Sequence, residues 1–276
     1  MHPPQRRWLT RRFTALRILA SGPLLTALLW AVPRSAYPAD WVPGSLREVG
    51  RLPGGGLAWE RDVVAGEETV RLTGISFRPE FLALRVADNP PESARKLAEA
   101  ASQSGAVAGC NASYFHEDGR PLGLVVQDGA ILHGQERAKL LSGVLAVRQG
   151  RLELTRSESF RLDDRVRQAV QSGPWLIEDG RPLPGLEAGR RARRTVIAAD
   201  SAGGWVLLAF SPVTLSATAR ILSQEGILPQ GSVRQALNLD GGSSTALWAG
   251  SVGLSVSEFG TVRNFLLLTP STRKER

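Results

Sequence analysis

Residues 195–210, TVIAADSAGGWVLLAF, hold two apolar runs on either side of a short polar turn. The runs are rich in β-branched, leucine and aromatic residues, which favour strands, while Asp200 and the pair Gly203–Gly204 are typical turn residues. The stretch therefore predicts two antiparallel strands joined by a turn.

Three neighbouring stretches repeat this pattern. In each, a turn dipeptide ending in glycine separates two short apolar or alternating runs, which is the strongest local signal of a hairpin. The stretches are LGLVVQDGAIL (122–132), LAVRQGRLEL (145–154) and WLIEDGRPL (175–183), with turns at Asp128–Gly129, Gln149–Gly150 and Asp179–Gly180. The middle of the chain is therefore expected to be antiparallel sheet.

Two stretches have helical spacing and end at a glycine. They are Pro91–Ser104 and Leu215–Glu225, and each precedes an apolar run of strand type, at 106–110 and 233–239. Together with the hairpins, they predict an α+β fold: a sheet-rich core of mixed or antiparallel strands with flanking helices.

The N-terminal segment has the order of a secretory signal. Residues 1–17 are strongly basic, residues 18–32 are uncharged and interrupted by Pro23, and small residues follow. A run of 15 residues is shorter than the roughly 20 that a membrane helix needs, so an uncleaved anchor is the second choice. We expect a signal peptide at 1–39, a single domain at 40–270, a frayed tail at 271–276, and a periplasmic or secreted protein.

Net charge and cysteine content exclude some function classes. The chain carries a formal charge of +8, but residues 1–39 contain six arginines and no acid, so the remainder carries only +2. Without a basic patch interleaved with aromatic residues, binding to nucleic acid loses its main support. Cys110 is the single cysteine, so no internal disulfide can form, and an apolar-flanked cysteine is usually a small buried residue.

Four polar segments lie beside predicted strands. They are Asn111–Gly119, Gln171–Pro174, Arg190–Thr195 and Asn238–Trp248. Loops at strand ends can converge on one ligand while the sheet holds them in place. The last segment, NLDGGSSTALW, places one carboxylate, Asp240, before two glycines and three hydroxyls.

These segments resemble the phosphodiester glycosidase family. The resemblance rests on GCNASYFHEDGRPLGLVVQDG, QSGPWLIEDG, RRTVIAAD and ALNLDGGSST, which follow one another in the family's order between residues 106 and 268. Three positions depart from the family pattern: Ala112 and Ser113 replace two glycines, and Ala198 replaces a third. Side chains narrow the backbone choices there, so the loop shape and the choice of substrate are expected to differ.

The resemblance implies hydrolysis of a sugar 1-phosphodiester on a glycan or glycoconjugate. Glycosidases normally use two carboxylates, whereas this sequence offers one strong candidate, Asp240. A phosphate monoester leaves as an anion and needs positive charge more than a proton donor, and Arg194 can supply a bidentate guanidinium. Asp240 is then expected to act as the base for water or as the nucleophile.

The other expected site residues have supporting roles. Asn111 and Asn238 would bind sugar hydroxyls or orient Asp240, and the amides of the following loop would form an anion nest. We predict the catalytic residues Asp240, Arg194 and Asn111, and the substrate-binding residues Asn238, Gly241, Gly242, Ser243, Gln171, Tyr114 and Phe115.

Several alternatives stay open at this stage. Glu117 or Asp118 would be the second carboxylate if one exists. Asp240 with nearby carbonyls offers oxygen ligands of the kind that Ca²⁺ or Mg²⁺ prefers, although no dedicated ligand spacing is present and no cofactor is otherwise implied. The rival functions are a non-catalytic periplasmic binder of phosphorylated glycans and a structural domain of the cell envelope. The sequence leaves the sugar and the oligomeric state open.

Overall fold

The computed structural model describes residues 40–271, and their strands form three sheets in which every strand pair is antiparallel. The predicted signal peptide at 1–39, and with it the expected export, lies outside the described residues, as does the tail after residue 271. Those predictions and the predicted domain limits therefore stay predictions.

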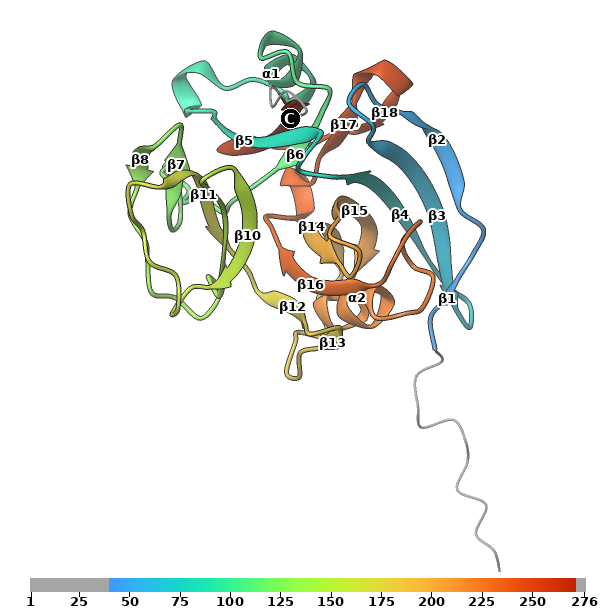
Figure 1. Ribbon diagram of the computed structural model, residues 1–276. Coiled ribbons are helices and arrows are strands. Elements are labelled where there is room, and N and C mark those ends of the chain that lie inside the picture. Colours follow the sequence, from blue (N-terminus) through green and yellow to red (C-terminus); the bar gives the residue numbers. More distant parts are fainter. Residues whose placement is uncertain (1–39, 272–276) are drawn as a thin grey trace, which may run out of the picture. The chain divides into compact units, whose positions relative to one another are not determined.

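The largest sheet has nine strands and contains the 195–210 hairpin near its centre (Figure 1). In spatial order its strands are β1 (Val42–Pro43), β3 (Leu57–Ala65), β4 (Glu68–Phe77), β15 (Trp205–Val213), β14 (Ala192–Asp200), β16 (Val233–Asn238), β12 (Trp175–Glu178) and β13 (Arg181–Pro182), with β2 (Arg47–Arg51) on β3.

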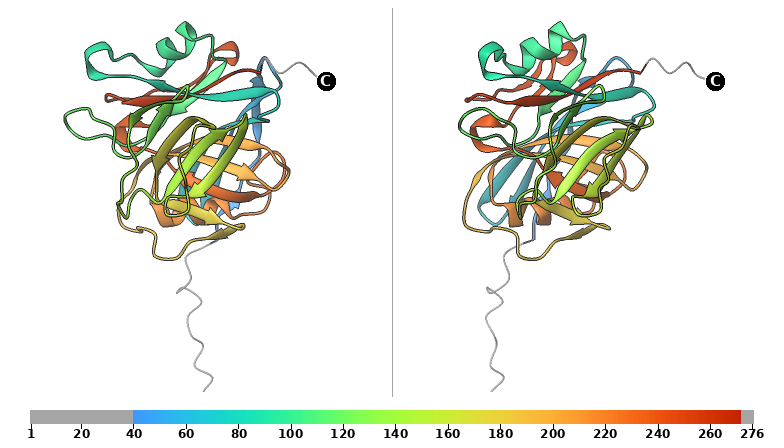
Figure 2. Two further views of the ribbon diagram at one scale, coloured as in Figure 1. Left: turned by 60° about the vertical axis from the view of Figure 1, so that its left-hand side comes forward. Right: turned by 90° about the vertical axis from the view of Figure 1, so that its left-hand side faces the viewer.

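The two other sheets have five strands each. One consists of β10 (Arg151–Arg156), β9 (Gly143–Arg148), β11 (Val166–Ser172), β7 (Val125–Gln127) and β8 (Ala130–His133). The other consists of β18 (Leu254–Val256), β17 (Leu247–Ala249), β6 (Ala108–Asn111), β19 (Asn264–Pro270) and β5 (Leu82–Asp88). The views in Figure 2 show the three sheets facing a common interior.

All four predicted hairpins are present. Their turns are tight because the residue before glycine takes a left-handed conformation at three of them: Asp128, Gln149 and Asp179 have φ near +50°. Such turns match the twist of the strands that they connect. The turn residues therefore predicted these four strand pairs correctly.

The predicted helices are shorter than expected. Residues 91–104 form a 3-10 turn at Pro91–Ser93 and the helix α1 only at Leu97–Gln103. The Asn89 side chain bonds both the amide and the carbonyl of Arg95, and the residues on either side of Arg95, Ala94 and Lys96, are extended. The helix α2 spans Leu215–Leu222, where the Thr214 hydroxyl caps its first turn.

These lengths correct the predicted fold class. The described residues contain two α-helices against nineteen strands, so the fold is mostly β rather than clearly α+β. The expectation of a sheet-rich antiparallel core is confirmed, while no strand pair among residues 40–271 is parallel.

The main core lies between the three sheets. It includes Ile75 and Ile197 from the nine-stranded sheet, Leu145 from the sheet of β9, and Cys110 and Leu266 from the sheet of β6. Burial of such side chains contributes roughly 1.5–3 kcal/mol each before chain entropy is counted. The opposite face of the nine-stranded sheet packs against α2, and α1 covers the sheet of β6 and β19 (Figure 1).

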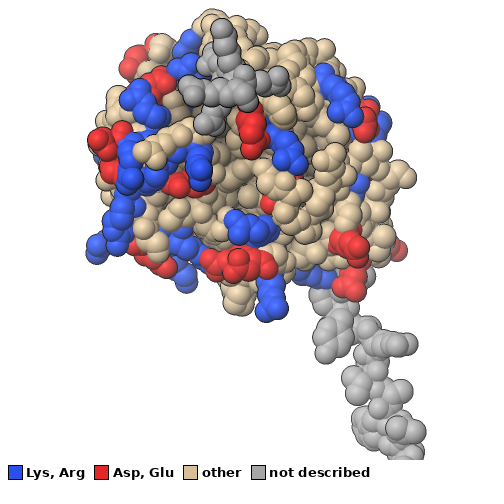
Figure 3. Space-filling model, in the orientation of Figure 1, with Lys and Arg blue, Asp and Glu red and all other residues tan. Residues whose placement is uncertain are grey.

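The surface mixes charges of both signs. On the face shown in Figure 3, acidic side chains lie among the Lys and Arg side chains, which gather most densely at its left. Within residues 40–271, no helix has the length and apolar character needed to cross a membrane.

Candidate active site

Asp240 and Arg194 lie at neighbouring strand ends, where β14 and β16 pair. The two strands pair with Val196 opposite Asn238, and one more backbone hydrogen bond, of 2.8 Å, continues the ladder beyond β16. Continuing this register places Asp240 opposite Arg194. Opposite residues of an antiparallel pair share one face of the sheet, with Cβ atoms about 4.5–5.5 Å apart.

A glycine makes the close approach of these two strand ends possible. A Cβ on Gly241 would lie 2.7 Å from the Arg193 carbonyl oxygen, closer than a side chain tolerates. Gly242 follows with φ +64°, a conformation that favours glycine, and opens the 3-10 turn Gly242–Ser244. The backbone therefore requires the two glycines that follow Asp240.

Asp240 is fixed by four hydrogen bonds. Its carboxylate accepts from the Gly241 amide at 2.8 Å and from the Ser244 hydroxyl. Its carbonyl oxygen accepts from Asn111 Nδ2 at 2.7 Å, and its amide donates to the Ala112 carbonyl at 2.9 Å. The carboxylate is therefore held in one orientation, at the end of a strand, while the residue remains half-buried.

The surroundings of Asp240 raise the pKa of its carboxyl group toward neutral pH. Burial raises the pKa of Asp240 to about 6, and the hydrogen bonds from Ser244 and Gly241 oppose this rise. A carboxylate with such a pKa can accept a proton near neutral pH more readily than an ordinary aspartate.

The raised pKa predicts a pH-dependent cost to stability. Between pH about 4 and about 6 the folded state holds a proton on Asp240 that the unfolded chain has lost, so stability falls as the pH rises through this window. Relative to the parent, Asp240→Asn is therefore expected to gain about 1–2 kcal/mol in unfolding free energy over this range. Denaturant titrations at several pH values measure it.

Asp118→Asn supplies a control of opposite sign. Hydrogen bonds from Arg120 hold the pKa of Asp118 below its usual value of 3.8, so the parent gains stability from this group as the pH rises toward about 4 and none above it. A stability difference for Asp240→Asn that does not change with pH contradicts the account of this carboxylate.

Arg194 is a buried arginine held by backbone carbonyls. Its Nε donates to the Val213 oxygen at 3.0 Å and its Nη2 to the Arg190 oxygen at 2.8 Å. Burial lowers the pKa of Arg194, although it stays far above neutral pH. Within the described residues no hydrogen-bond partner is found for Nη1, so one side of a rigid cation is left for a ligand.

A second carboxylate lies beside this arginine, and the sequence had not indicated it. Glu187 Oε2 is 3.9 Å from Arg194 Nη2, and the amides of Gly189 and Arg190 bind the same side chain. These hydrogen bonds lower the pKa of the exposed Glu187, so it remains ionised and is unsuited to donate a proton.

Tyr114 and Asn238 join the Gln171–Pro174 segment to this face. Tyr114 Oη donates to the Gly173 carbonyl at 2.7 Å and accepts from Asn238 Nδ2 at 2.7 Å. Burial and the charge of Asp240 raise the pKa of Tyr114, while Arg194 opposes them, so both groups act on the phenol. All four polar segments predicted from the sequence therefore meet here.

Asn238 also offers an unused acceptor. Its side chain is almost fully buried, and Oδ1 has no hydrogen-bond partner among the described residues. A buried acceptor without a partner costs about 1–3 kcal/mol, which a ligand hydroxyl would recover. Substrate binding by Asn238 stays a prediction, because this atom itself has almost no surface open to a ligand.

Asn111 lies on the other side of the strand junction. Its Oδ1 accepts from the Thr195 hydroxyl at 2.7 Å and from the Ala246 amide at 2.9 Å, and its Nδ2 holds Asp240. The side chain is fully buried, with both polar atoms bonded to protein. Of its two predicted roles, these contacts favour orienting Asp240 over contact with substrate, so we reassign Asn111 from catalysis to positioning.

Gln171 does not fit its predicted role in substrate binding. Its Oε1 accepts from the amides of Leu124 and Glu136, each at 3.0 Å, and its Nε2 donates to the carbonyls of Glu136 and Leu141. The side chain is fully buried and ties β11 to the 134–142 loop. It holds the 134–142 loop, whose residues Leu140 and Ser142 lie against Gly173, and it is not exposed to a ligand.

The roles of the two serines also differ from the prediction. Ser244, buried, reaches Asp240 because the 3-10 turn brings it back toward the carboxylate. Ser243 is exposed, and its carbonyl accepts from the amides of Phe259 at 2.8 Å and Gly260 at 3.2 Å. The support expected from Ser243 therefore comes from its neighbour.

Phe259 is a further candidate that the sequence did not indicate. It is 78% exposed although its backbone is bonded to the Gly242–Ser244 turn, and its ring lies 4.4 Å from the Arg193 guanidinium. An exposed aromatic ring in this position is suited to packing against the apolar face of a sugar. No local sequence pattern could have placed it beside Ser243.

The remaining candidates of the first loop are less closely tied to this face. Phe115 is half-buried and forms an antiparallel bridge with Pro121. It follows Tyr114, whose hydroxyl is bonded to Asn238. Glu117 and Asp118 are exposed, and Asp118 is paired with Arg120. Cys110 is fully buried, which raises the pKa of its thiol and agrees with a packing role.

The structure adds no metal ligands beside Asp240 within the described residues. Among residues 40–271, no three His, Cys, Asp or Glu side chains gather in a way that could hold an ion.

Ser113, one of the departures from the family pattern, has a structural partner. Its hydroxyl and the Asn264 side chain bond each other, with distances of 2.7 and 3.1 Å.

The family model for phosphodiester glycosidases matches residues 104–273. No curated protein matches the chain.

Three solved structures are similar in fold. A hypothetical protein from Synechocystis shares 18% identity at a TM-score of 0.57, over 78% of this chain and 62% of that one. The zebrafish N-acetylglucosamine-1-phosphodiester alpha-N-acetylglucosaminidase catalytic domain, auto-inhibited by its pro-peptide, shares 15% identity at 0.54, over 85% of each chain. A Burkholderia pseudomallei protein shares 14% at 0.51, over 73% and 74%. At these identities the likeness shows the fold alone.

Proposed function

The chain belongs to the phosphodiester glycosidase family, and on that premise we propose that it hydrolyses the glycosidic C–O bond of a sugar 1-phosphodiester. The observation that carries the proposal is the register of β14 and β16, which sets residue Asp240 opposite residue Arg194 at the strand ends. Export to the periplasm or beyond, predicted from residues 1–39, is part of this proposal.

Asp240 acts as the base in this mechanism. Its carboxylate takes a proton from water while the water oxygen bonds to the anomeric carbon, and the bond from that carbon to the phosphate oxygen breaks. The electron pair leaves with the phosphate monoester. A base with a pKa of about 6 is ionised at neutral pH and accepts the proton there.

Arg194 binds the leaving phosphate. Its guanidinium is already oriented by two carbonyls, so little side-chain freedom is lost when Nη1 meets a phosphate oxygen. The charge that develops on the leaving group is then stabilised by a fixed cation, which replaces the proton donor of other glycosidases. The free Asn238 Oδ1 accepts a hydrogen bond from a sugar hydroxyl on the same face.

An assay with defined substrates tests the proposal. Purified protein would be incubated with methyl-phosphate diesters of glucose, mannose, N-acetylglucosamine and N-acetylgalactosamine, linked at the anomeric carbon. Release of free reducing sugar from at least one of them supports hydrolysis. Saturable binding without any product would instead favour a non-catalytic receptor for phosphorylated glycans, and the enzyme assignment would fall.

Phe259 is predicted to contribute to sugar binding. Phe259→Ala removes the exposed ring beside Ser243 and is expected to raise KM about 3- to 10-fold with little change in kcat, because stacking contributes about 0.5–1.5 kcal/mol. Steady-state kinetics on the best diester measure this. Phe259→Trp should retain the parent KM, and a KM that is unchanged in Phe259→Ala removes this role.

A further inference from the structure

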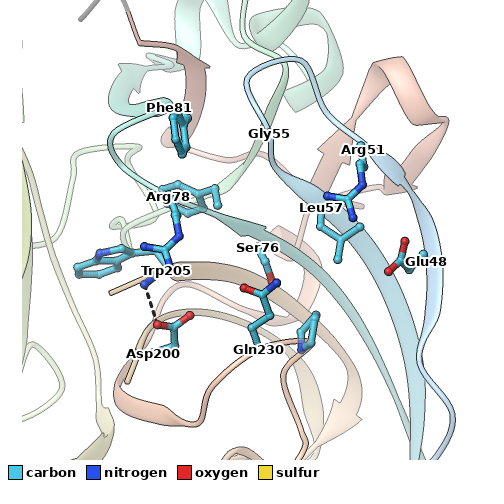
Figure 4. Close-up of a pocket in the computed structure, with 13 residues that line it drawn as sticks. Glu48, Arg51, Gly55, Leu57, Ser76, Arg78, Phe81, Asp200, Trp205 and Gln230 are labelled. Atoms are coloured by element: carbon cyan, nitrogen blue, oxygen red, sulfur yellow. Dashed lines mark hydrogen bonds between the residues drawn. The ribbon is translucent and has the colours of Figure 1, made fainter. Parts of the chain in front are cut away.

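A cavity of about 310 Å³ opens at the ends of the strands β3, β4, β15 and β14 of the nine-stranded sheet. Figure 4 shows its two sides: Arg51 and Glu48 from β2 lie on one, and Phe81, Arg78 and Trp205 lie on the other, with Gln230 and Ser76 between them. None of these residues belongs to the site around Asp240. The cavity is large enough for a sugar unit or two.

The apolar part of the cavity is aromatic. Phe81 is 50% exposed at the rim, whereas Phe77 and Trp205 are buried and present only part of their rings. The exposed half of Phe81 leaves apolar surface in water, and the C–H face of a pyranose ring is a suitable cover for it.

The polar part carries equal numbers of cations and carboxylates. Arg51 and Arg78 face the cavity together with Glu48 and Asp200. A hydroxyl group donates to a carboxylate and accepts from a guanidinium, so a balanced set of this kind suits an uncharged, hydroxyl-rich ligand. A cavity selective for anions would hold an excess of arginine and lysine.

Part of this polar set is already oriented. Asp200 Oδ1 accepts from the amides of Ala202 at 2.8 Å and Gly204 at 2.7 Å, and Arg78 donates to the Ala202 carbonyl at 3.2 Å. Within residues 40–271, by contrast, no hydrogen bond or ion pair engages the side chain of Arg51. The cavity therefore combines fixed groups with a free cation at the rim.

A second cavity continues the first. It measures about 460 Å³, shares Asp200, Gly204 and Trp205 with it, and extends toward Arg234 and Gln235. The two cavities thus share the turn between β14 and β15. Together they can accommodate several units of a polysaccharide.

The position of this turn relates the cavity to the candidate active site. Arg194 and Asp200 lie six residues apart on the same strand, β14, which corresponds to roughly 20 Å at about 3.3 Å per residue. We propose that the Phe81–Asp200 cavity is a second saccharide site that binds uncharged sugar units of the glycan whose phosphodiester reacts at Asp240. This rests on the proposed function, and it makes the substrate a polymer rather than a small diester.

Affinity electrophoresis of the full chain tests the second site separately from catalysis. Native gels would contain dextran, hydroxyethyl cellulose or glycol chitin, three uncharged polysaccharides. At least one is expected to retard the parent, with the same retardation in 0.5 M NaCl. Phe81→Ala and Arg51→Ala should each weaken that binding about five- to tenfold, because each removes one stacking or charged contact.

Variants of similar residues outside the cavity serve as controls. Ile131→Ala removes an equally exposed apolar side chain and Arg151→Ala an exposed arginine, both from the sheet of β9, and neither should change the retardation. Asp240→Asn should be retarded like the parent even when it is inactive, so the two proposals fail separately. Absence of retardation by all three polymers, its loss in salt, or its persistence in either Phe81→Ala or Arg51→Ala overturns the second site.

Discussion

Asp240→Asn is expected to fold normally and to lose about 10³-fold in kcat on a sugar 1-phosphodiester. The amide is nearly isosteric with the carboxylate and can still accept the hydrogen bond from the Gly241 amide. It cannot take a proton from water at neutral pH. Initial rates at saturating substrate, together with circular dichroism of both proteins, measure the effect.

The neighbouring carboxylates supply the comparison for this variant. Glu117→Gln and Asp118→Asn change exposed acids of the first loop and should keep kcat within about twofold, since neither contacts the strand junction. A kcat that falls strongly in Glu117→Gln or Asp118→Asn identifies a second catalytic carboxylate. Near-parental turnover by Asp240→Asn removes the central residue of the mechanism.

Arg194→Lys is expected to lower kcat/KM about 10- to 100-fold. Lysine keeps the charge but cannot contact the carbonyls of Val213 and Arg190 and a phosphate oxygen in one plane. Hydrogen bonds to charged groups are typically worth about 1.5–3 kcal/mol, which sets the size of the loss. Kinetics with the methyl-phosphate diester measure it.

The same arginine run contains the control. The Arg191 side chain is engaged elsewhere: it pairs with Glu68 and donates to the Pro212 carbonyl. Arg191→Lys should therefore leave kcat/KM unchanged. Equal losses in the two variants would mean that the positive charge of the whole run, rather than one positioned guanidinium, supports the reaction.

Local chemistry was sufficient to predict the hairpins and the four loops of the site. The turns at Asp128, Gln149 and Asp179 depend on residues that tolerate positive φ beside glycine, and such preferences are visible in short windows. The Asp-Gly-Gly segment was likewise recognised, because its glycines are needed wherever two backbones approach closely.

Contacts between distant segments decided the features that the sequence did not predict correctly. The helix near residue 91 starts late because Asn89 bonds the backbone of Arg95, and the first amide of α1 is bonded by Glu258, more than 150 residues away. Gln171 was expected in the site because it lies in a matching motif, yet its neighbours across the sheet use all of its polar atoms. The periodicity of apolar residues in the sequence does not reveal such distant hydrogen-bond partners.

The same reasoning explains the missed Phe259. Its local sequence is an ordinary loop, and its place beside Ser243 depends on two backbone hydrogen bonds and a contact with Arg193 that only the folded chain provides. Surface aromatic residues of this kind are found by their exposure in a structure.

Hydrolysis in water enriched in ¹⁸O tests most directly which bond is cleaved. If water assisted by Asp240 attacks the anomeric carbon while Arg194 holds the departing phosphate, mass spectrometry will find the label in the released sugar and none in the phosphate monoester. Label in the phosphate instead would mean attack at phosphorus, and the assignment of Asp240 to the sugar and Arg194 to the leaving group would be contradicted.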